Sequence, residues 1–317
     1  MSTAAAQVEQ VKSRLSFKLE VPQMSYAATQ AACGCVAGIV ADVATHPIAT
    51  VKTRIQVQGA GGGHHGAAAY TGLLQGFTSI VRHEGARTLY KGLGAVIACA
   101  APAQGLYFTG YEASKGMLGG GQSSAGNFVS GMIAQACGSL VWVPMDVVKE
   151  RLQVEGQVKV AEVYTGSFHA FGQIMRKEGL MGLYRAFPIH NLTWAPFNGF
   201  YFCIFEKCKM WCIDAGYADE HDRLHTEAQL CSATAAGVIS ATVTNPLDVV
   251  KTRLQVARAN PEMFPFSNSW QATKHLLEHE GAAALMDGAV ARAAWLTPRL
   301  ALCVSVYDWA KGKVIEG

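Results

Sequence analysis

The chain is short of charged residues. Only 15% of its 317 residues are Asp, Glu, Lys or Arg, whereas soluble domains carry about 25%. Hydrophobic residues make up 50%, and 33 residues are glycine, which suits helices that pack closely in a bilayer. The net charge of +3 is small and gives no indication of a nucleic-acid partner. This composition favours a membrane protein.

Motifs for common reactive sites are also missing. The nine cysteines form no CxxC pair and show no zinc-ligand spacing, so neither a disulfide scaffold nor a structural zinc is indicated. There is no Ser/His/Asp set, no phosphate-binding loop and no converging pair of carboxylates. We therefore expect no enzyme activity and no cofactor.

One charged octapeptide occurs three times. The copies are PIATVKTR (47–54), PMDVVKER (144–151) and PLDVVKTR (246–253), with prolines 97 and 102 residues apart. Two further motifs follow each copy in the same order: EGARTLYKG, EGLMGLYRA and EGAAALMDG, then YEASK, FEKCK and YDWAK. Three landmarks repeated in one order predict three tandem repeats of about 100 residues. We place the repeats at 26–118, 119–213 and 214–317, after a leader at 1–25.

Each repeat contains two stretches of the roughly 20 residues that cross a bilayer. We expect these spans near 26–46, 92–112, 125–145, 187–206, 227–247 and 289–309. Polar residues that interrupt them should face the bundle interior or a water-filled cavity: Asp42, Gln104, His190, Asn191, Arg292 and Arg299. Shorter amphipathic patterns between the spans indicate surface helices. The sequence thus predicts an all-α membrane protein with six transmembrane helices in pseudo-threefold arrangement.

Basic residues are distributed unevenly between the loops. The three loops within repeats hold 15 Lys and Arg, and the two between repeats hold four. The positive-inside rule therefore places the within-repeat loops in the inner compartment and both termini outside. Residues 1–20 lack the apolar core of a secretory signal and carry acids that a transit peptide avoids, so we expect a solvated leader.

The octapeptides predict a gate. Pro47, Pro144 and Pro246 each remove a backbone donor and kink a helix, and membrane helices tolerate such kinks because neighbours satisfy the freed groups. Three kinks in threefold array would bring the helix tips together. The acid and base after each kink would then pair with adjacent helices and close a cavity, until a ligand offers compensating contacts.

By these motifs the chain resembles the mitochondrial carrier family over about residues 26–313. The octapeptides match Px[DE]xx[KR]x[KR], and the later motifs match [DE]Gxxxx[aromatic][KR]G and [FY][DE]xx[KR]. The resemblance implies a monomeric transporter of the mitochondrial inner membrane that moves a small solute or metal ion by alternating access. It also implies matrix-side surface helices, bound cardiolipin-type lipids and termini in the intermembrane space.

The resemblance implies a matrix gate of two ion pairs. Asp146 would pair with Lys251, and Asp248 with Lys52, while Ala49 cannot supply the acid that Lys149 needs. Gln56, Gln153 and Gln255 match the family's glutamine braces beneath the pairs. With Lys149 left without a partner, we expect this gate to open at low cost.

A cytoplasmic gate is implied at the opposite end. Its acids would be Glu112, Glu206 and Asp308, and its bases Lys115, Lys209 and Lys311. The second motif departs from the family pattern in two repeats: Ala186 replaces the glycine in the second, and Met286 and Asp287 replace the aromatic and basic residues in the third.

The family's substrate contact points fall at Cys99, at Thr193 with its neighbour Trp194, and at Trp295. None is charged, which argues against nucleotides, phosphate and tricarboxylates, since these anions are usually met by Arg or Lys. The segments APAQGLYFTGYE (101–112) and APFNGFYF (195–202) resemble the mitoferrins, which favours iron.

The iron hypothesis has a weak point at its ligands. The mitoferrin histidines correspond here to Asp42, Gln104 and Gln229. Asp42 and Cys99 are therefore the candidate metal ligands, because carboxylate and thiolate can both bind divalent metals. His64 and His65 lie in a Gly-rich segment that reads first as a flexible loop.

Two alternatives stay open. The first is S-adenosylmethionine or another small cationic or zwitterionic metabolite: the faces of Trp194 and Trp295 would hold a cation, Asp42 an amine and Arg299 a carboxylate. The second is a carrier-fold scaffold that no longer transports, of which the departures at Ala49, Ala186 and Asp287 would be signs.

Overall fold

The computed structural model describes residues 26–59, 70–117, 124–157, 164–217 and 225–315, and these ranges contain helices and no strand. The expected leader (1–25) and the His64–His65 segment lie outside them. The long helices are α2 (Tyr26–Val57), α4 (Leu93–Met117), α5 (Ser124–Val154), α7 (Phe187–Asp214), α8 (Thr226–Val243), α9 (Asn245–Val256) and α11 (Ala289–Ile315). Every expected span therefore lies within long helical structure.

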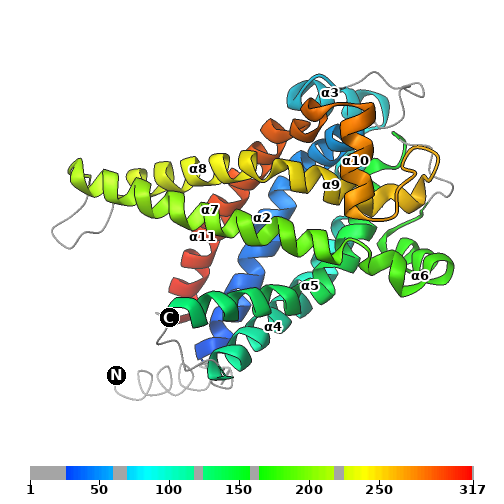
Figure 1. Cartoon of the computed structure of the whole chain (residues 1–317). Helices are drawn as coiled ribbons and strands as arrows, with labels where there is room; N and C mark the ends of the chain where they lie inside the picture. The colour runs from blue at the N-terminus through cyan, green and yellow to red at the C-terminus, as the bar shows by residue number, and fades with distance from the viewer. Residues whose placement is uncertain (1–25, 60–69, 118–123, 158–163, 218–224, 316–317) are drawn as a thin grey trace, which may run out of the picture.

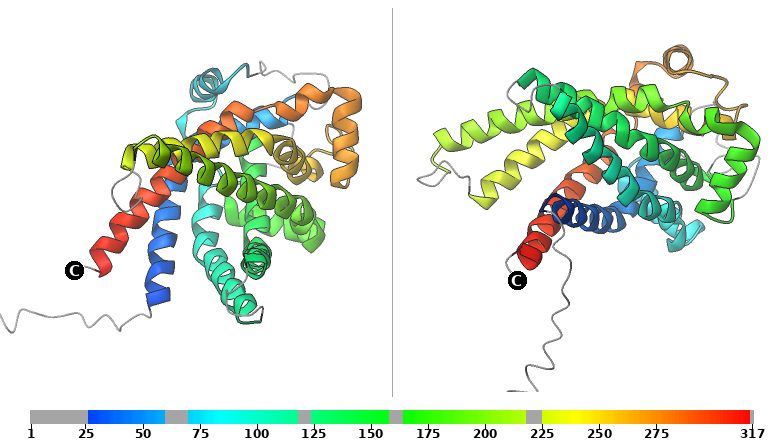
Figure 2. Two further views of the ribbon diagram at one scale, coloured as in Figure 1. Left: turned by 60° about the vertical axis from the view of Figure 1, so that its left-hand side comes forward. Right: turned by 90° about the horizontal axis from the view of Figure 1, so that it is seen from below.

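The long helices form a closed ring. Neighbours in contact are α2 and α4, α4 and α5, α5 and α7, α7 and α8, α8 and α11, and finally α11 and α2. The helices splay apart at one end and converge at the other (Figures 1 and 2). The start of α2 and the end of α11 lie at the splayed end. The helices therefore come closest together at the converged end.

Length and composition alone support four candidate spans in the described residues: Ala32–Val57, Ala86–Met117, Val129–Val154 and Ala282–Lys313. The helices α7 and α8 are not among them. Polar residues such as His190, Asn191 and Asn198 lower the hydropathy of α7, and Glu227 and Gln229 lower that of α8. Since they complete the ring, all six helices fit the carrier architecture.

The prolines act differently in the three repeats. Pro47 lies inside α2 and Pro144 inside α5, so both helices continue past the proline. In the third repeat, Thr244 leaves the helical conformation and Pro246 begins a separate helix, α9. This fits the general rule that proline disfavours helical geometry in the preceding residues and is welcome in a first turn.

Three surface helices lie at the converged end: α3 (Leu73–His83), α6 (Ser167–Tyr184) and α10 (Ser269–His279) (Figure 1). Each packs one apolar residue against the end of its own repeat's proline helix: Ile80 near Val51, Ile174 near Val148, and Leu276 near Val249. Near the start of each helix a large apolar side chain is exposed: Leu74, Phe168 and Trp270. Such side chains suit an interface with lipid.

Short 3₁₀ helices link two of the surface helices to the next span. They are η1 (Ala86–Tyr90) and η3 (Ala282–Met286), and a third, η2 (Ala257–Ala259), follows α9. Gly92 and Gly288 come next with φ of 84° and 72°, where glycine is favoured. Ala186, at the matching place in the second repeat, has φ of −86°. Alanine is thus tolerated there because the turn is built differently.

Candidate transport cavity and gate

A cavity of about 290 Å³ opens inside the ring. All three repeats contribute to its wall. Its polar lining includes Asp42 and His46 of α2, Gln104 of α4, Gln135, Asp146 and Lys149 of α5, His190 of α7, and Arg299 of α11, beside Trp194 and Trp295. A cavity of this size fits a small solute.

An ion pair between Asp42 and Arg299 lies on the wall of the cavity. Arg299 Nε lies 2.5 Å from Asp42 Oδ1, and its Nη2 lies 3.3 Å from Oδ2. The guanidinium also stacks 6.0 Å from the ring centroid of Trp295. The pair joins α2 to α11, the first helix to the last, and both side chains border the cavity.

The expected substrate contacts divide into two groups. Asp42, Gln104, Trp194, Trp295 and Arg299 line the cavity. Cys99 instead packs against an apolar cluster, and Thr193 is fully buried with its hydroxyl donated to the Ile189 carbonyl. Neither Cys99 nor Thr193 is among the residues that line the cavity in this structure, so their role as substrate contacts stays a prediction.

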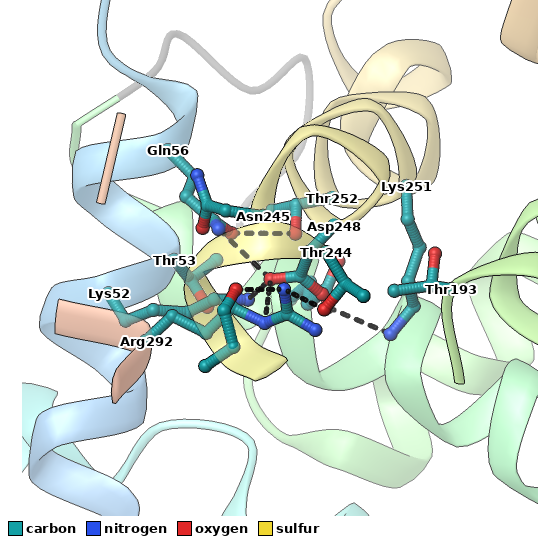
Figure 3. A network of polar contacts seen from close by, with 12 residues as sticks. Lys52, Thr53, Gln56, Thr193, Thr244, Asn245, Asp248, Lys251, Thr252 and Arg292 are labelled. Carbon is teal, nitrogen blue, oxygen red and sulfur yellow. Dashed lines mark hydrogen bonds and ion pairs between the residues drawn. The ribbon is translucent and has the colours of Figure 1, made fainter. Parts of the chain in front are cut away.

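Both expected matrix-gate pairs are formed where the helices converge. Lys52 Nζ lies 2.5 Å from Asp248 Oδ2, and Lys251 Nζ lies 2.7 Å from Asp146 Oδ2. All four side chains are buried, so each charge depends on its partner. Figure 3 shows Lys52 and Asp248 meeting between α2 and α9. Of these four residues Asp146 borders the cavity, as does Lys149. We call the four residues, together with Lys149, Glu150 and Arg292, the gate floor.

Lys149 has a partner, contrary to the expectation from Ala49. Its Nζ lies 2.8 Å from Asp146 Oδ1, on the same helix three residues earlier. Asp146 therefore serves two lysines at once, and His190 Nδ1 lies 3.3 Å from it. A long lysine side chain can turn back along its own helix, so the missing acid on α2 does not leave the lysine unpaired.

Arg292 adds a fourth cation that sequence reasoning left without a role. It is buried, with Nε 3.4 Å from Asp248, and it donates to the Ala241 carbonyl and the Thr244 hydroxyl (Figure 3). The expectation that it faces the bundle interior is confirmed. Its partners include the backbone oxygen freed near the Pro246 break, which explains an arginine inside a span.

The three glutamines contact the gate region unequally. Gln56 donates to Asp248 at 2.9 Å and accepts from Thr252. Gln153 bonds Thr50 and Thr53 of α2, next to the position without an acid. With its amide turned so that both atoms find partners, Gln255 donates to Glu150. Only Gln56 directly braces one of the two predicted pairs.

A second ring lies beyond the gate floor, and the sequence reasoning missed it. In Arg54, Arg151 and Arg253, the guanidinium Nε donates to a backbone carbonyl on the next helix: Gln153, Gln255 and Gln56 respectively. Each arginine is also paired with the glutamate of its own repeat's EG motif: Glu84, Glu178 and Glu280. The arginines thus join α2 to α5, α5 to α9, and α9 back to α2. Their fixed distance from each proline was the available signal.

The residue before the Gly92, Ala186 and Gly288 positions ties neighbouring elements together. Lys91 pairs with Glu155 at 2.6 Å, and Arg185 donates to the Ser267 carbonyl. Partial burial, with Arg258 nearby, lowers the pKa of Arg185. Asp287 reverses the charge and lies 3.9 Å from Arg253 Nη2. The departure at Asp287 therefore retains an ionic contact.

The proposed cytoplasmic gate pairs are not formed among the described side chains. No ion pair joins Glu112, Lys115, Glu206, Lys209 and Lys311 there; the side chain of Asp308 lies outside the description. Glu112 and Glu206 are exposed. The gate floor is therefore closed by ion pairs in this structure, whereas the cytoplasmic gate stays a prediction.

The two proposed metal ligands, Asp42 and Cys99, are not arranged as a metal site in this structure. Asp42 is occupied by Arg299, and Cys99 is turned into an apolar cluster. Within the described ranges, no three His, Cys, Asp or Glu side chains come together in a way that could hold a metal ion.

Comparison with known proteins agrees with the repeats. The family model "Mitochondrial carrier protein" matches residues 23–122, 120–216 and 222–317. The chain is 38% identical over 288 residues to mitochondrial substrate carrier family protein E of Dictyostelium discoideum, covering 88% of this chain and 93% of that protein. It is 30% identical over 297 residues to mitochondrial citrate transporter C of Aspergillus niger, covering 88% of each.

A third relative is longer. The chain is 30% identical over 293 residues to the electrogenic aspartate/glutamate antiporter SLC25A12 of Mus musculus, covering 92% of this chain but only 41% of that protein. None of these three relatives is named as an iron carrier. The threefold family match, the ring of helices and the ion pairs after each proline lead to one conclusion: the chain belongs to the mitochondrial carrier family, whose members are transporters of small solutes.

Proposed function

We propose that this carrier moves a small amino carboxylate across the mitochondrial inner membrane by alternating access through the described cavity. The observation that carries the proposal is the Asp42–Arg299 pair on the cavity wall. A solute with an amine and a carboxylate offers a new partner to each side chain. Exchanging one ion pair for two leaves neither of these partly buried charges unpaired, and an unpaired charge is the state that costs most.

The tryptophans support the same class of solute. Trp295 lies beside Arg299, and the Lys52 Nζ lies 5.8 Å from the centroid of the Trp295 ring. Trp194 also borders the cavity. Their ring faces suit an ammonium group or the apolar part of an amino acid. Two relatives are named as carriers of aspartate and glutamate or of citrate, which are solutes with carboxylates.

Among the solutes considered from sequence, S-adenosylmethionine belongs to this class because it carries both an amine and a carboxylate. Iron has less support, since neither proposed ligand is free to bind it. The orientation with both termini in the intermembrane space, the monomeric state and the contact with cardiolipin-type lipids remain parts of the proposal.

The test is uptake into proteoliposomes of labelled amino acids, S-adenosylmethionine and Fe²⁺. We expect uptake of at least one amino carboxylate and none of Fe²⁺. Asp42→Asn and Arg299→Gln should each reduce uptake by more than about tenfold, because each leaves one charge unpaired and removes one substrate contact.

The double variant Asp42→Asn/Arg299→Gln is the decisive control. It removes both charges and so relieves the structural penalty, but it cannot bind the solute's ionic groups. Recovery of uptake in the double variant would mean that the pair only holds α2 to α11, and the proposal would fail. If the wild-type protein takes up none of the tested solutes and no solute stabilises it thermally, a scaffold role would be favoured.

A further inference from the structure

The gate floor is asymmetric at one position. In the second and third repeats, Asp146 and Asp248 follow the proline and bind lysines of adjacent helices. The matching residue of the first repeat is Ala49, which borders the cavity together with Lys149 and His46. Where a third acid would meet Lys149, α2 therefore presents only a methyl group to the open space.

Lys149 is the gate lysine that the cavity reaches. Its side chain is 15% exposed, against 6% for Lys52 and 5% for Lys251, and it alone of the three lines the cavity. Its partner Asp146 is shared with Lys251, and His190 lies within 3.3 Å of the same carboxylate. Lys149 thus shares the Asp146 carboxylate with Lys251, and its ammonium group still has donors that can face the cavity.

The gate floor contains more cations than carboxylates. Four cations, Lys52, Lys149, Lys251 and Arg292, meet three carboxylates, Asp146, Glu150 and Asp248. Glu150 is buried, and its nearest gate cation is Lys251 at 3.8 Å, so it does not reach Lys149. An excess cation that borders a cavity attracts an anion.

We propose that Lys149, opposite Ala49, forms an anion subsite at the cavity floor, where a second acidic group of the transported solute takes the place of the missing gate acid. This inference rests on the proposed function, since the Asp42–Arg299 pair would hold the solute's amine and first carboxylate. It narrows the solute class to amino carboxylates with an additional carboxylate, such as acidic amino acids. The absence of an acid at position 49 would then determine which solutes the carrier selects.

The subsite acts on specificity, so the test compares an acid with its isosteric amide. In proteoliposomes, wild-type protein should take up aspartate, or the longer glutamate, with at least about tenfold lower KM than asparagine or glutamine, because a charged hydrogen bond at Lys149 is lost with the amide. Lys149→Gln should abolish that preference.

Ala49→Asp and Ala49→Asn form the matched pair of variants. The two new side chains have nearly the same size, but only aspartate fills the subsite with a carboxylate. We expect Ala49→Asp to raise the KM for the acidic solute by about tenfold or more and to leave the KM for its amide within about twofold. Ala49→Asn should preserve the preference for the acid.

Three results would overturn the subsite. One is an equal change of KM in Ala49→Asp and Ala49→Asn. Another is a fall in maximal rate alone for both solutes in Ala49→Asp, which would mean that the acid only strengthens the gate. The third is wild-type uptake of amides in preference to acids, which would leave the proposed function standing. If no amino carboxylate enters at all, the proposed function fails together with the subsite. Should Ala49→Asp fail to fold, Lys149→Gln decides the matter by the same ratio.

Discussion

The converged and splayed ends of this molecule both carry motif charges, but in different settings. At the converged end, the gate floor and the arginine ring bury their charges and pair them across helices. At the splayed end, the described motif residues Glu112, Lys115 and Glu206 have no ionic partner. The same kind of side chain therefore stabilises the structure at one end and stays available at the other. How much each charged side chain contributes to stability therefore depends on its burial and not on the motif that contains it.

The largest effect should follow from removing the most connected carboxylate. Asp248 serves Lys52, Arg292 and Gln56. Asp248→Asn leaves two buried cations short of a counter-charge, and we expect a loss of about 3 kcal/mol in the free energy of unfolding. A clear fall in the melting temperature of the purified protein would show it. An unchanged melting temperature would mean that the gate floor contributes little to this state.

An intermediate effect is expected in the arginine ring. Arg54 donates to the Gln153 and Glu155 carbonyls and is paired with Glu84. Arg54→Lys keeps the charge but lacks the planar fork, so at least one buried carbonyl loses its donor, at a cost of about 1–3 kcal/mol. Thermal unfolding measures this cost. A lysine variant as stable as the parent would show that charge alone joins α2 to α5.

The smallest effect on stability belongs to the splayed end. Because Glu206 is exposed and unpaired in this part of the structure, Glu206→Gln should change the unfolding free energy by less than about 0.5 kcal/mol. Its uptake rate should nevertheless fall if the cytoplasmic gate forms during transport. A melting temperature that drops as far as in Asp248→Asn would remove the distinction between the two ends.

The part of this molecule that sequence predicts best is what repeats. The helices and their threefold arrangement follow from three motifs in register, and the pairs Asp146–Lys251 and Asp248–Lys52 follow from the resemblance to the carrier family. The partner of Lys149 did not follow, because a lysine that turns back on its own helix competes with partners across the bundle. The arginine ring was missed since its acceptors are backbone carbonyls, which any residue supplies.

Two other predictions stay open. Cys99 and Thr193 come from counting along a motif, and they do not line the cavity in this structure, because a position along a helix does not by itself fix which way the side chain points. The cytoplasmic pairs are predicted for a closed outer end, and the described residues do not form them here.

The arginine ring also bears on chain connectivity. Its bonds run from the first repeat to the second, from the second to the third, and from the third to the first, so no repeat occupies a special end of the series. The helices α2 and α11 lie in contact like any other neighbours. A circular permutant that begins at the second repeat would retain every bond of the ring. The bonds of the arginine ring therefore do not depend on which repeat comes first in the chain.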